Sequence, residues 1–249
     1  MEKTIVLLHG FGEDHHIFDG QIDRFDSLYR VFAPDLPGSG MLKDHVWERG
    51  TETIEWMADW VFDQLKTENI SECILLGHSM GGYITLAFAE KYPEMLSAFG
   101  LIHSTGFADS EAKKETRSKA ILFMEEKGGY TFLKTAIPGL FAPCFSAKYP
   151  LEVQDLVEKA RNFQLHSLVA YYRAMIARPD RTNVLKAATV PVLIIAGTED
   201  MAVPLTDLLL QSSMPAICHF HILQDVGHMG MVEAPGNFHD ILLNFFAAV

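Results

Sequence analysis

The chain has 249 residues, of which 49% are hydrophobic and 21% are charged. This composition supplies enough apolar side chains for one large core and excludes an intrinsically disordered chain. Twenty Lys and Arg stand against 32 Asp and Glu, so the formal net charge is −12. Because basic side chains that neutralise phosphates provide most of the non-specific affinity for nucleic acid, DNA and RNA are excluded as expected partners.

The first residues of the chain and its cysteines indicate the cellular compartment of the protein. Residues 1–4 lead directly into an apolar segment, without the long apolar stretch and small-residue cleavage site of a signal peptide. Cys73, Cys144 and Cys218 are an odd set without CxxC spacing, which predicts buried free thiols instead of disulfides or a zinc site. We therefore expect a soluble, cytoplasmic protein that has no membrane association.

Short apolar segments alternate with helical patterns along most of the chain. Apolar residues recur at helical spacing between residues 54 and 65, and two more helical stretches cover 83–91 and 238–245. This alternation predicts an α/β fold with a mostly parallel sheet, which binds ligands at the carboxyl ends of its strands. The expected strands are 5–8, 31–33, 73–76, 99–102, 192–196 and 217–223.

The alternation stops between residues 104 and 182, where helical patterns at 111–127 and 165–177 follow one another. We interpret 104–182 as a helical cap (lid) inserted into a core domain that consists of 1–103 and 183–249. The insertion has 12 Lys and Arg and 9 Asp and Glu, whereas the core has 8 and 23. A basic cap on an acidic core is compatible with an anionic substrate or an acidic carrier protein, and equally with solvated helix faces.

Residues 77–81, Gly-His-Ser-Met-Gly, match the pattern G-x-S-x-G between an expected strand and an expected helix. In that context a sharp strand-to-helix turn holds Ser79 in a strained conformation with its hydroxyl exposed, and the glycines avoid collisions within the turn. The alternative is a turn with an incidental serine. The strand before it and the helix after it favour a nucleophile.

A serine nucleophile needs a base and a third group that orients the base. Asp200 lies in a loop after the fifth expected strand, and its neighbour Glu199 competes for the same role. His228 follows the last expected strand in a Gly-His loop. The chain order Ser79, Asp200, His228 is the order found in α/β hydrolases.

The glycine-rich loop after the first strand, His9-Gly10-Phe11-Gly12, offers backbone N–H groups near the nucleophile. We expect the N–H groups of Phe11 and Met80 to form an oxyanion hole, and a plain glycine turn is the alternative. His219 and His221 share one side of a strand, but no third ligand has a characteristic spacing. Neither a metal nor a cofactor is predicted.

Together these motifs resemble the α/β-hydrolase superfamily over nearly the whole chain. The resemblance is carried by His9-Gly10, by the loop 35–40 with sequence Asp-Leu-Pro-Gly-Ser-Gly, by the nucleophile turn, by 197–200 and by Gly227-His228. It implies a parallel sheet flanked by helices with a cap over the site. Because the chain starts at what would be the third strand, a sheet of about six strands is expected, as in compact members.

The residue types favour acyl transfer to water. A serine at position 79 argues against the dehalogenase and epoxide-hydrolase branches, which need an aspartate there. We therefore expect a serine carboxylesterase that acts on a small or medium acyl ester. Phe107 and Phe141 of the cap are candidate substrate-binding residues, although such apolar residues also form cap cores.

Three other functions remain open. Carbon–carbon bond hydrolases with the same triad would use a basic cap residue such as Arg161, Arg173 or Arg178, and the pyruvate-eliminating lyase of menaquinone synthesis would need several arginines near Ser79. The basic cap also resembles that of esterases for pimeloyl-carrier-protein methyl esters. A non-catalytic ligand receptor on this scaffold is the third possibility, against which the complete triad argues. The sequence alone does not determine the oligomeric state.

Overall fold

The computed structural model describes residues 3–25, 27–48 and 50–249. Its centre is one six-stranded sheet in the order β2-β1-β3-β4-β5-β6, and every neighbouring pair is parallel. This confirms the predicted fold class and the expected strand number. The strands are β1 (Thr4–Leu8), β2 (Arg30–Phe32), β3 (Cys73–His78), β4 (Leu96–Ile102), β5 (Val192–Gly197) and β6 (Cys218–Leu223).

Two strands, β3 and β4, extend two or more residues beyond their predicted apolar runs. β4 starts at Leu96 because Leu96 still pairs with Cys73, across a register shift. β3 continues to His78, which pairs with Ile102, so the ladder runs up to the residue before Ser79. The predicted strand 73–76 was too short because Gly77 and His78 carry no apolar signal.

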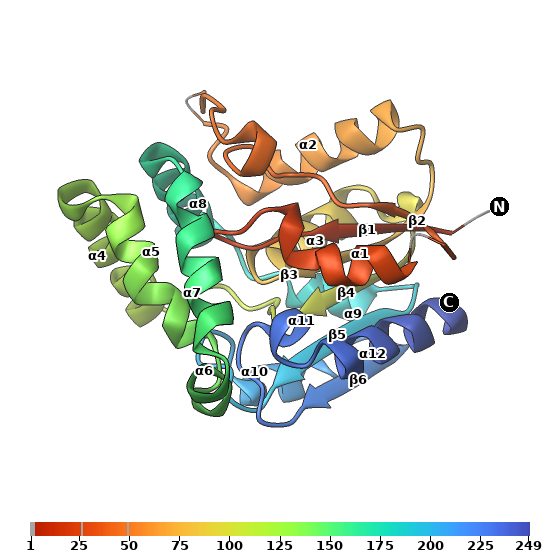
Figure 1. Ribbon diagram of the computed structural model, residues 1–249. Coiled ribbons are helices and arrows are strands. Elements are labelled where there is room, and N and C mark those ends of the chain that lie inside the picture. The colour runs from red at the N-terminus through yellow and green to blue at the C-terminus, as the bar shows by residue number, and fades with distance from the viewer. Residues whose placement is uncertain (1–2, 26, 49) are drawn as a thin grey trace.

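Helices cover both faces of the sheet (Figure 1). On one face α2 packs against α3 and α3 against α9, and on the other α1 packs against α12, which also contacts β6. The helices outside the insertion are α1 (Asp19–Phe25), α2 (Ile54–Thr67), α3 (Met80–Lys91), α9 (Thr182–Ala187), α10 (Leu205–Gln211), α11 (Gly230–Glu233) and α12 (Pro235–Ala248), with 3₁₀ turns η1 (His15–Phe18), η2 (Gly40–Leu42) and η3 (Pro93–Met95).

Between β4 and α9 the described chain forms helices only, and we call residues 104–182 the cap segment. Its helices α4, α5, α7 and α8 stand together beyond one end of the sheet, at the left of Figure 1. The predicted helices 111–127 and 165–177 are confirmed by α4 and α8. The cap segment contains α4 (Glu111–Lys127), α5 (Gly129–Ala136), η4 (Ile137–Leu140), α6 (Pro143–Lys148), α7 (Pro150–Lys159), η5 (Ala160–Asn162) and α8 (Leu165–Ala177). Its separation from the core as a lid domain stays an interpretation.

Local sequence explains where these helices begin and end. The Thr53 hydroxyl accepts the Trp56 N–H at 3.1 Å and caps α2, whose buried residues recur along one face. The Ser110 hydroxyl caps α4 by accepting the Lys113 N–H at 3.3 Å, and Gly128 ends that helix at a φ of 92°. A side chain at this φ would be strained, so glycine suits the end of α4.

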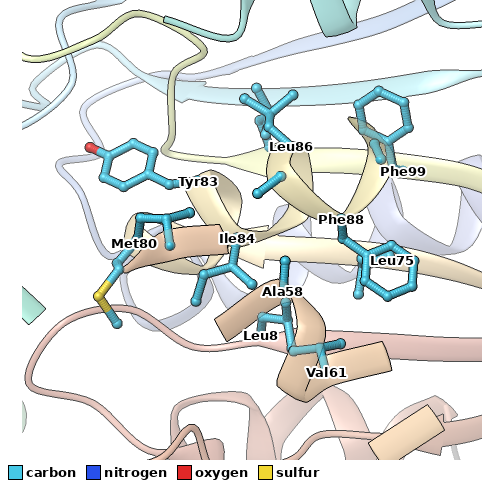
Figure 2. Packing of buried hydrophobic residues seen from close by; sticks show 14 of the residues in the cluster. Leu8, Ala58, Val61, Leu75, Met80, Tyr83, Ile84, Leu86, Phe88 and Phe99 are labelled. Atoms are coloured by element: carbon cyan, nitrogen blue, oxygen red, sulfur yellow. The ribbon is translucent and has the colours of Figure 1, made fainter. Parts of the chain in front are cut away.

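The core forms two apolar layers, one on each face of the sheet. Figure 2 shows the layer in which Leu8 of β1 and Leu75 of β3 meet helices α2 and α3. Nearly all of α3 is buried, from Met80 to Ala89, because it lies between the sheet and α2. The helix that follows Ser79 is therefore packed on most sides, and this packing fixes the position of the turn before it.

The cysteines only partly follow the expectation. None of the three is in a disulfide, and Cys73 is buried, but Cys218 is partly exposed and Cys144 is exposed. The prediction of buried thiols was wrong for Cys144, because it lies on the outer side of the short helix α6. Among the described residues, no helix combines the length and apolar content needed to cross a membrane.

Candidate active site

Ser79 lies in a strained turn between β3 and α3. Its φ of 51° and ψ of −114° are rare for a residue with a side chain. The turn is held because the Ser79 N–H donates to the Ile102 carbonyl at 3.0 Å and the Ser104 hydroxyl donates to the Ser79 carbonyl at 2.7 Å. A Cβ on Gly77 would overlap the backbone of Gly81, as the sequence pattern predicts for a nucleophile turn.

The loop after β5 places Asp200 against His228. The His228 Nδ1 lies 2.8 Å from the Asp200 Oδ2. The other oxygen of Asp200 accepts the N–H groups of Ala202 and Val203, each at 2.8 Å, so the carboxylate is fixed at both oxygens. Glu199 is exposed, whereas Asp200 is 5% exposed. Of the two acids that the sequence left open, only Asp200 contacts the histidine.

A second histidine shares the same carboxylate oxygen. The His103 Nδ1 lies 3.2 Å from the Asp200 Oδ2, and His103 is fully buried at the end of β4 with a φ of 47°. Burial lowers the pKa of His103 to about 4, against the opposing pull of Asp200, so this imidazole is neutral near pH 7. Burial alone would raise the pKa of the Asp200 carboxyl, but His228 and His103 hold it well below its usual range.

A buried pair, His78 and Glu13, lies behind the residues that line the site. The His78 Nδ1 lies 2.9 Å from the Glu13 Oε2, and its Nε2 lies 3.0 Å from the His228 carbonyl oxygen. The same Glu13 oxygen accepts the Gly10 N–H at 2.7 Å. Burial opposes both charges, yet their attraction and hydrogen bond raise the pKa of His78 and lower the pKa of Glu13. His78 thereby links the loop after β1 to the loop that carries His228.

One expected oxyanion donor, Phe11, lies in the loop after β1, and the other, Met80, lies at the start of α3. The Phe11 N–H donates to no acceptor among the described residues, and its loop is held by the Glu13 contact with Gly10. Met80 is the first residue of α3, so its N–H has no partner within the helix. Both backbone groups are therefore free to bind an anionic oxygen, and the N-terminus of α3 favours negative charge there.

Ser79 and His228 line the same cavity, which has a volume of about 600 Å³. One side of the cavity comes from the sheet end, including Phe11 and Val203, and the other side from the cap segment, including Leu140 and Met175. The cavity therefore lies between the carboxyl ends of the strands and the cap segment, at the edge that an α/β sheet uses for ligands.

The two cap phenylalanines have different surroundings. Phe107 lines the cavity together with Ser79. Phe141 is 5% exposed and stacks on Phe145, with ring centroids 5.4 Å apart and planes at 11°. It is absent from the cavity lining among the described residues. Its aromatic side chain faces the apolar core instead, so the structure leaves Phe107 as the substrate-binding candidate of the pair.

Charged residues form a buried cluster in the cap side of the cavity wall. The Arg117 Nε lies 2.7 Å from the Asp109 Oδ2, and the Arg178 Nη1 lies 2.9 Å from the Asp109 Oδ1. Arg178 also lies over the Tyr83 ring, with 3.7 Å from its Cζ to the centroid. Burial opposes ionisation of Asp109, but the two guanidinium groups hold its pKa below the usual range. One carboxylate thus faces two permanent positive charges.

The sequence named three cap arginines that could reach the cavity, and only Arg178 lines it among the described residues. The side chains of Arg161 and Arg173 are 57% and 53% exposed and pair with acids on the helix surface. Arg117 was missed because its position in the long polar helix α4 has no distinguishing pattern. Glu13, the role of His78 and the contact of His103 with Asp200 were missed for a similar reason, since these contacts join residues far apart in the chain. The position of His103 at the end of a strand had indicated only that it could line the site.

Two groups of side chains among the described residues are compact enough to hold a metal ion. The first is His103, Asp200 and His228, whose facing atoms already pair with one another by hydrogen bonds. The second contains the partly exposed His15 with the exposed His16 and Asp19. His219 and His221 belong to neither group. In the second group, the His15 Nδ1 lies 2.7 Å from the Asp35 Oδ1 and the His16 Nδ1 lies 3.0 Å from the Asp19 Oδ2.

Comparison with known proteins identifies the class. The chain matches the alpha/beta hydrolase family over residues 5–241 and belongs to that family. A thermophilic esterase from Thermogutta terrifontis, solved with malate bound, superimposes with a TM-score of 0.92 at 25% identity, covering 99% of this chain and 90% of the esterase.

Two curated relatives differ in how much they share. A putative carbamate hydrolase from Pantoea ananatis is 25% identical over 98% of this chain and 88% of its own length. A 1-acylglycerol-3-phosphate O-acyltransferase from Arabidopsis thaliana is 37% identical, but the match covers 47% of this chain and 28% of the acyltransferase. The chain thus spans less than a third of that relative, and the activity of this protein is a matter for proposal.

Proposed function

We propose that the protein is a serine hydrolase that cleaves carboxylic esters through an acyl-enzyme. The observation that carries the proposal is the contact between His228 and Asp200 at 2.8 Å, in a cavity that Ser79 also lines. When the His228 Nδ1 carries the proton donated to Asp200, its Nε2 has a free lone pair that can accept the Ser79 proton.

The proposed reaction has two halves. The Ser79 oxygen attacks the ester carbonyl while His228 takes the hydroxyl proton, and the N–H groups of Phe11 and Met80 stabilise the oxyanion. His228 then returns the proton to the leaving alkoxide, which departs as an alcohol. Water, deprotonated by His228, attacks the acyl-enzyme in the same way and releases the acid and free Ser79. Asp200 keeps the imidazole oriented and stabilises its positive charge.

The cavity supports a small or medium acyl substrate. Its volume of about 600 Å³ lies in the usual range for small-molecule sites, and Phe107 offers an apolar wall. The named esterase and putative carbamate hydrolase among the relatives favour hydrolysis as the reaction class. Three cysteines outside any disulfide fit the cytoplasmic location predicted from the sequence.

The test is hydrolysis of 4-nitrophenyl esters of increasing acyl length, followed from the first milliseconds in the wild type and in Ser79→Ala. We expect a burst of 4-nitrophenol, then steady turnover that peaks at one acyl length, because deacylation follows a faster acylation. Ser79→Ala loses the burst and at least about 10⁴-fold in kcat/KM. Ser118→Ala, which removes an exposed hydroxyl of α4, is the matched control and retains full activity.

A fluorophosphonate probe supplies an independent measurement, since it reacts covalently with activated serines. Labelling in the wild type and Ser118→Ala, but not in Ser79→Ala, is the expected pattern. Turnover that survives in Ser79→Ala contradicts the assignment of Ser79 as the nucleophile. The absence of both turnover and labelling in the wild type contradicts the proposal and favours a ligand receptor.

Carbon–carbon bond hydrolysis is the second candidate, and Arg178 in the cavity wall is the observation that favours it. Such an enzyme binds an anionic substrate next to the same triad. Arg178, however, already donates to the Met175 and Phe107 carbonyls at 2.8 and 3.0 Å and pairs with Asp109. Turnover of vinylogous 1,5-diketone acids without turnover of any ester would favour this candidate.

A further inference from the structure

We propose that the cap side of the cavity contains a carboxylate-binding subsite in which Arg117 binds the ligand and Asp109 and Arg178 hold Arg117 in place. The ester substrate would then carry a free carboxylate. This inference rests on the proposed esterase function for its substrate class, and its experiment includes a binding measurement that needs no turnover.

The first argument is the charge of the cavity wall. Its cationic side chains are Lys113, Arg117 and Arg178, and its acidic side chains, apart from Glu13 in the pair with His78, are Asp109 and Asp207. With Glu13 included, the described lining has three cationic and three acidic side chains, so the positive excess is local: the single carboxylate of Asp109 pairs with both Arg117 and Arg178. In a cavity with low-dielectric walls, a cluster of two guanidinium groups and one carboxylate attracts a monoanion.

The second argument is that Arg117 and Arg178 differ in exposure and in how many of their nitrogens already have partners. Arg178 has a side chain that is 3% exposed, and its nitrogens are engaged by Asp109 and two backbone carbonyls. Arg117 has a side chain that is 13% exposed and gives only its Nε to Asp109. Its Cζ lies 5.0 Å from the centre of the Tyr172 ring, and the guanidinium reaches no second carboxylate among the described residues. Arg117 is the cation that remains available to a ligand.

The third argument is the position of Arg117 relative to the proposed chemistry. Arg117 and Phe11 both lie against the Tyr172 ring: the Arg117 Cζ is 5.0 Å from its centroid, and the Phe11 ring centroid is 4.4 Å from it. Phe11 is a proposed oxyanion donor and lines the cavity with Arg117 and Ser79, so the residue of that donor and the available guanidinium contact the same aromatic ring. A ligand that reaches both positions needs a short chain between its ester carbonyl and its anionic group.

A carboxylate fits this subsite better than other anions. The planar fork of a guanidinium matches a carboxylate with two hydrogen bonds, and the single excess charge of the two guanidinium groups with Asp109 equals the charge of one carboxylate. A phosphate monoester would bring up to two negative charges into a wall that already contains Asp109 and Asp207. The substrate class that follows is a monoester of a short dicarboxylic acid.

The experiment compares two methyl esters of equal length, monomethyl glutarate and methyl 4-carbamoylbutanoate, in which a neutral amide replaces the carboxylate. Methanol release gives kcat/KM for each. In the wild type we expect the anionic ester to be preferred by about tenfold or more, as for a charge-assisted hydrogen bond in a semi-buried site. Arg117→Met reduces this ratio to about one, and Arg117→Lys restores part of it.

Arg161→Met is the matched control, because it removes one cap arginine whose side chain is 57% exposed and absent from the cavity lining. It keeps the wild-type ratio if the effect belongs to the subsite instead of the overall cap charge. Equal kcat/KM for the two esters in the wild type, or a ratio unchanged in Arg117→Met, overturns the inference while the esterase function stands.

Calorimetric titration separates the two proposals. Monomethyl glutarate is titrated into Ser79→Ala and into the same protein with Arg117→Met, or into the wild type if no ester is turned over. Binding that is about tenfold weaker without Arg117 supports the subsite even if esterase activity is absent. Binding no stronger than that of methyl 4-carbamoylbutanoate rejects the subsite. This ligand comparison also decides the matter if Arg117→Met does not fold.

Discussion

The two sides of the cavity are built in different ways. On the sheet side, the polar groups are fixed by backbone atoms at the ends of strands: Asp200 by two N–H groups, His78 by the His228 carbonyl and Ser79 by Ile102. On the cap side, Arg117 and Asp109 are fixed mainly by side chains from neighbouring segments. Backbone anchors hold atoms to the small tolerances that bond making requires, whereas side-chain clusters can vary between relatives without disturbing the sheet.

The difference predicts that substitutions on the sheet side change the rate of reaction and that those on the cap side change stability and substrate choice. Three variants test this division, and a fourth, at His103 on the sheet side, tests acid stability; they are taken from the largest expected effect to the smallest.

Asp200→Asn is expected to lower kcat/KM for the best ester by about 10⁴-fold, because an amide can favour the wrong tautomer of His228 and does not stabilise its charge. Steady-state hydrolysis measures the loss. Glu199→Gln is the matched control, since Glu199 is exposed, and it stays within about twofold of the wild type. If Glu199→Gln loses activity and Asp200→Asn retains it, the assignment of the acid is wrong.

Arg178→Met is expected to destabilise the fold by about 3 kcal/mol, because it removes a buried partner of Asp109 and leaves two carbonyls without their donors. Urea unfolding measures the change. The control Arg173→Met removes an arginine whose pairs are 3.9 Å long and whose side chain is 53% exposed, so it changes stability by about 0.5 kcal/mol or less. Equal effects of the two variants would contradict a structural role for Arg178.

The buried His103 predicts a loss of stability in mild acid. In the unfolded chain this histidine takes up a proton as the pH falls below about 6.5, but in the folded protein its pKa is about 4. The unfolded state therefore binds more protons between these values, and up to about 3 kcal/mol of stability is lost as the pH falls through this window. Urea unfolding at several pH values measures the slope.

His103→Asn should show a shallower slope in that window, because asparagine does not titrate and tolerates the positive φ of 47° at this position. His16→Asn, at an exposed histidine, is the control and keeps the wild-type slope. A slope unaffected by His103→Asn would mean that other groups cause the acid sensitivity.

The smallest expected effect is that of Ser79→Ala on stability. The Ser79 hydroxyl donates to no acceptor among the described residues, and alanine keeps the Cβ that the turn already accommodates. Thermal unfolding should therefore shift by about 2 °C or less. A fall of about 8 °C or more would show that the serine stabilises the turn, and loss of activity in this variant would then have a structural cause.

Prediction from the sequence was accurate where the residues that determine a local structure are adjacent in the chain. The helices at 111–127 and 165–177 were predicted to the residue: Ser110 and Gly128 mark the ends of the first, and Pro179 follows the end of the second. The turn at Ser79 was recognisable because its glycines and its flanking strand and helix are adjacent in the chain. The strands at 30–32 and 96–102 were less accurate, since pairing with neighbours extends or shortens a strand beyond its apolar run.

The chain by itself determined the α/β fold, the turn that exposes Ser79 and the order of the three candidate catalytic residues, because each depends on residues close in sequence. Only the tertiary structure distinguished Asp200 from Glu199, placed His103 on the same carboxylate and turned Phe141 into the core. It also brought Arg117 and Arg178 to one aspartate in the cavity wall. These contacts join separate elements, and their geometry follows from how the sheet and the cap segment pack, which no local pattern encodes.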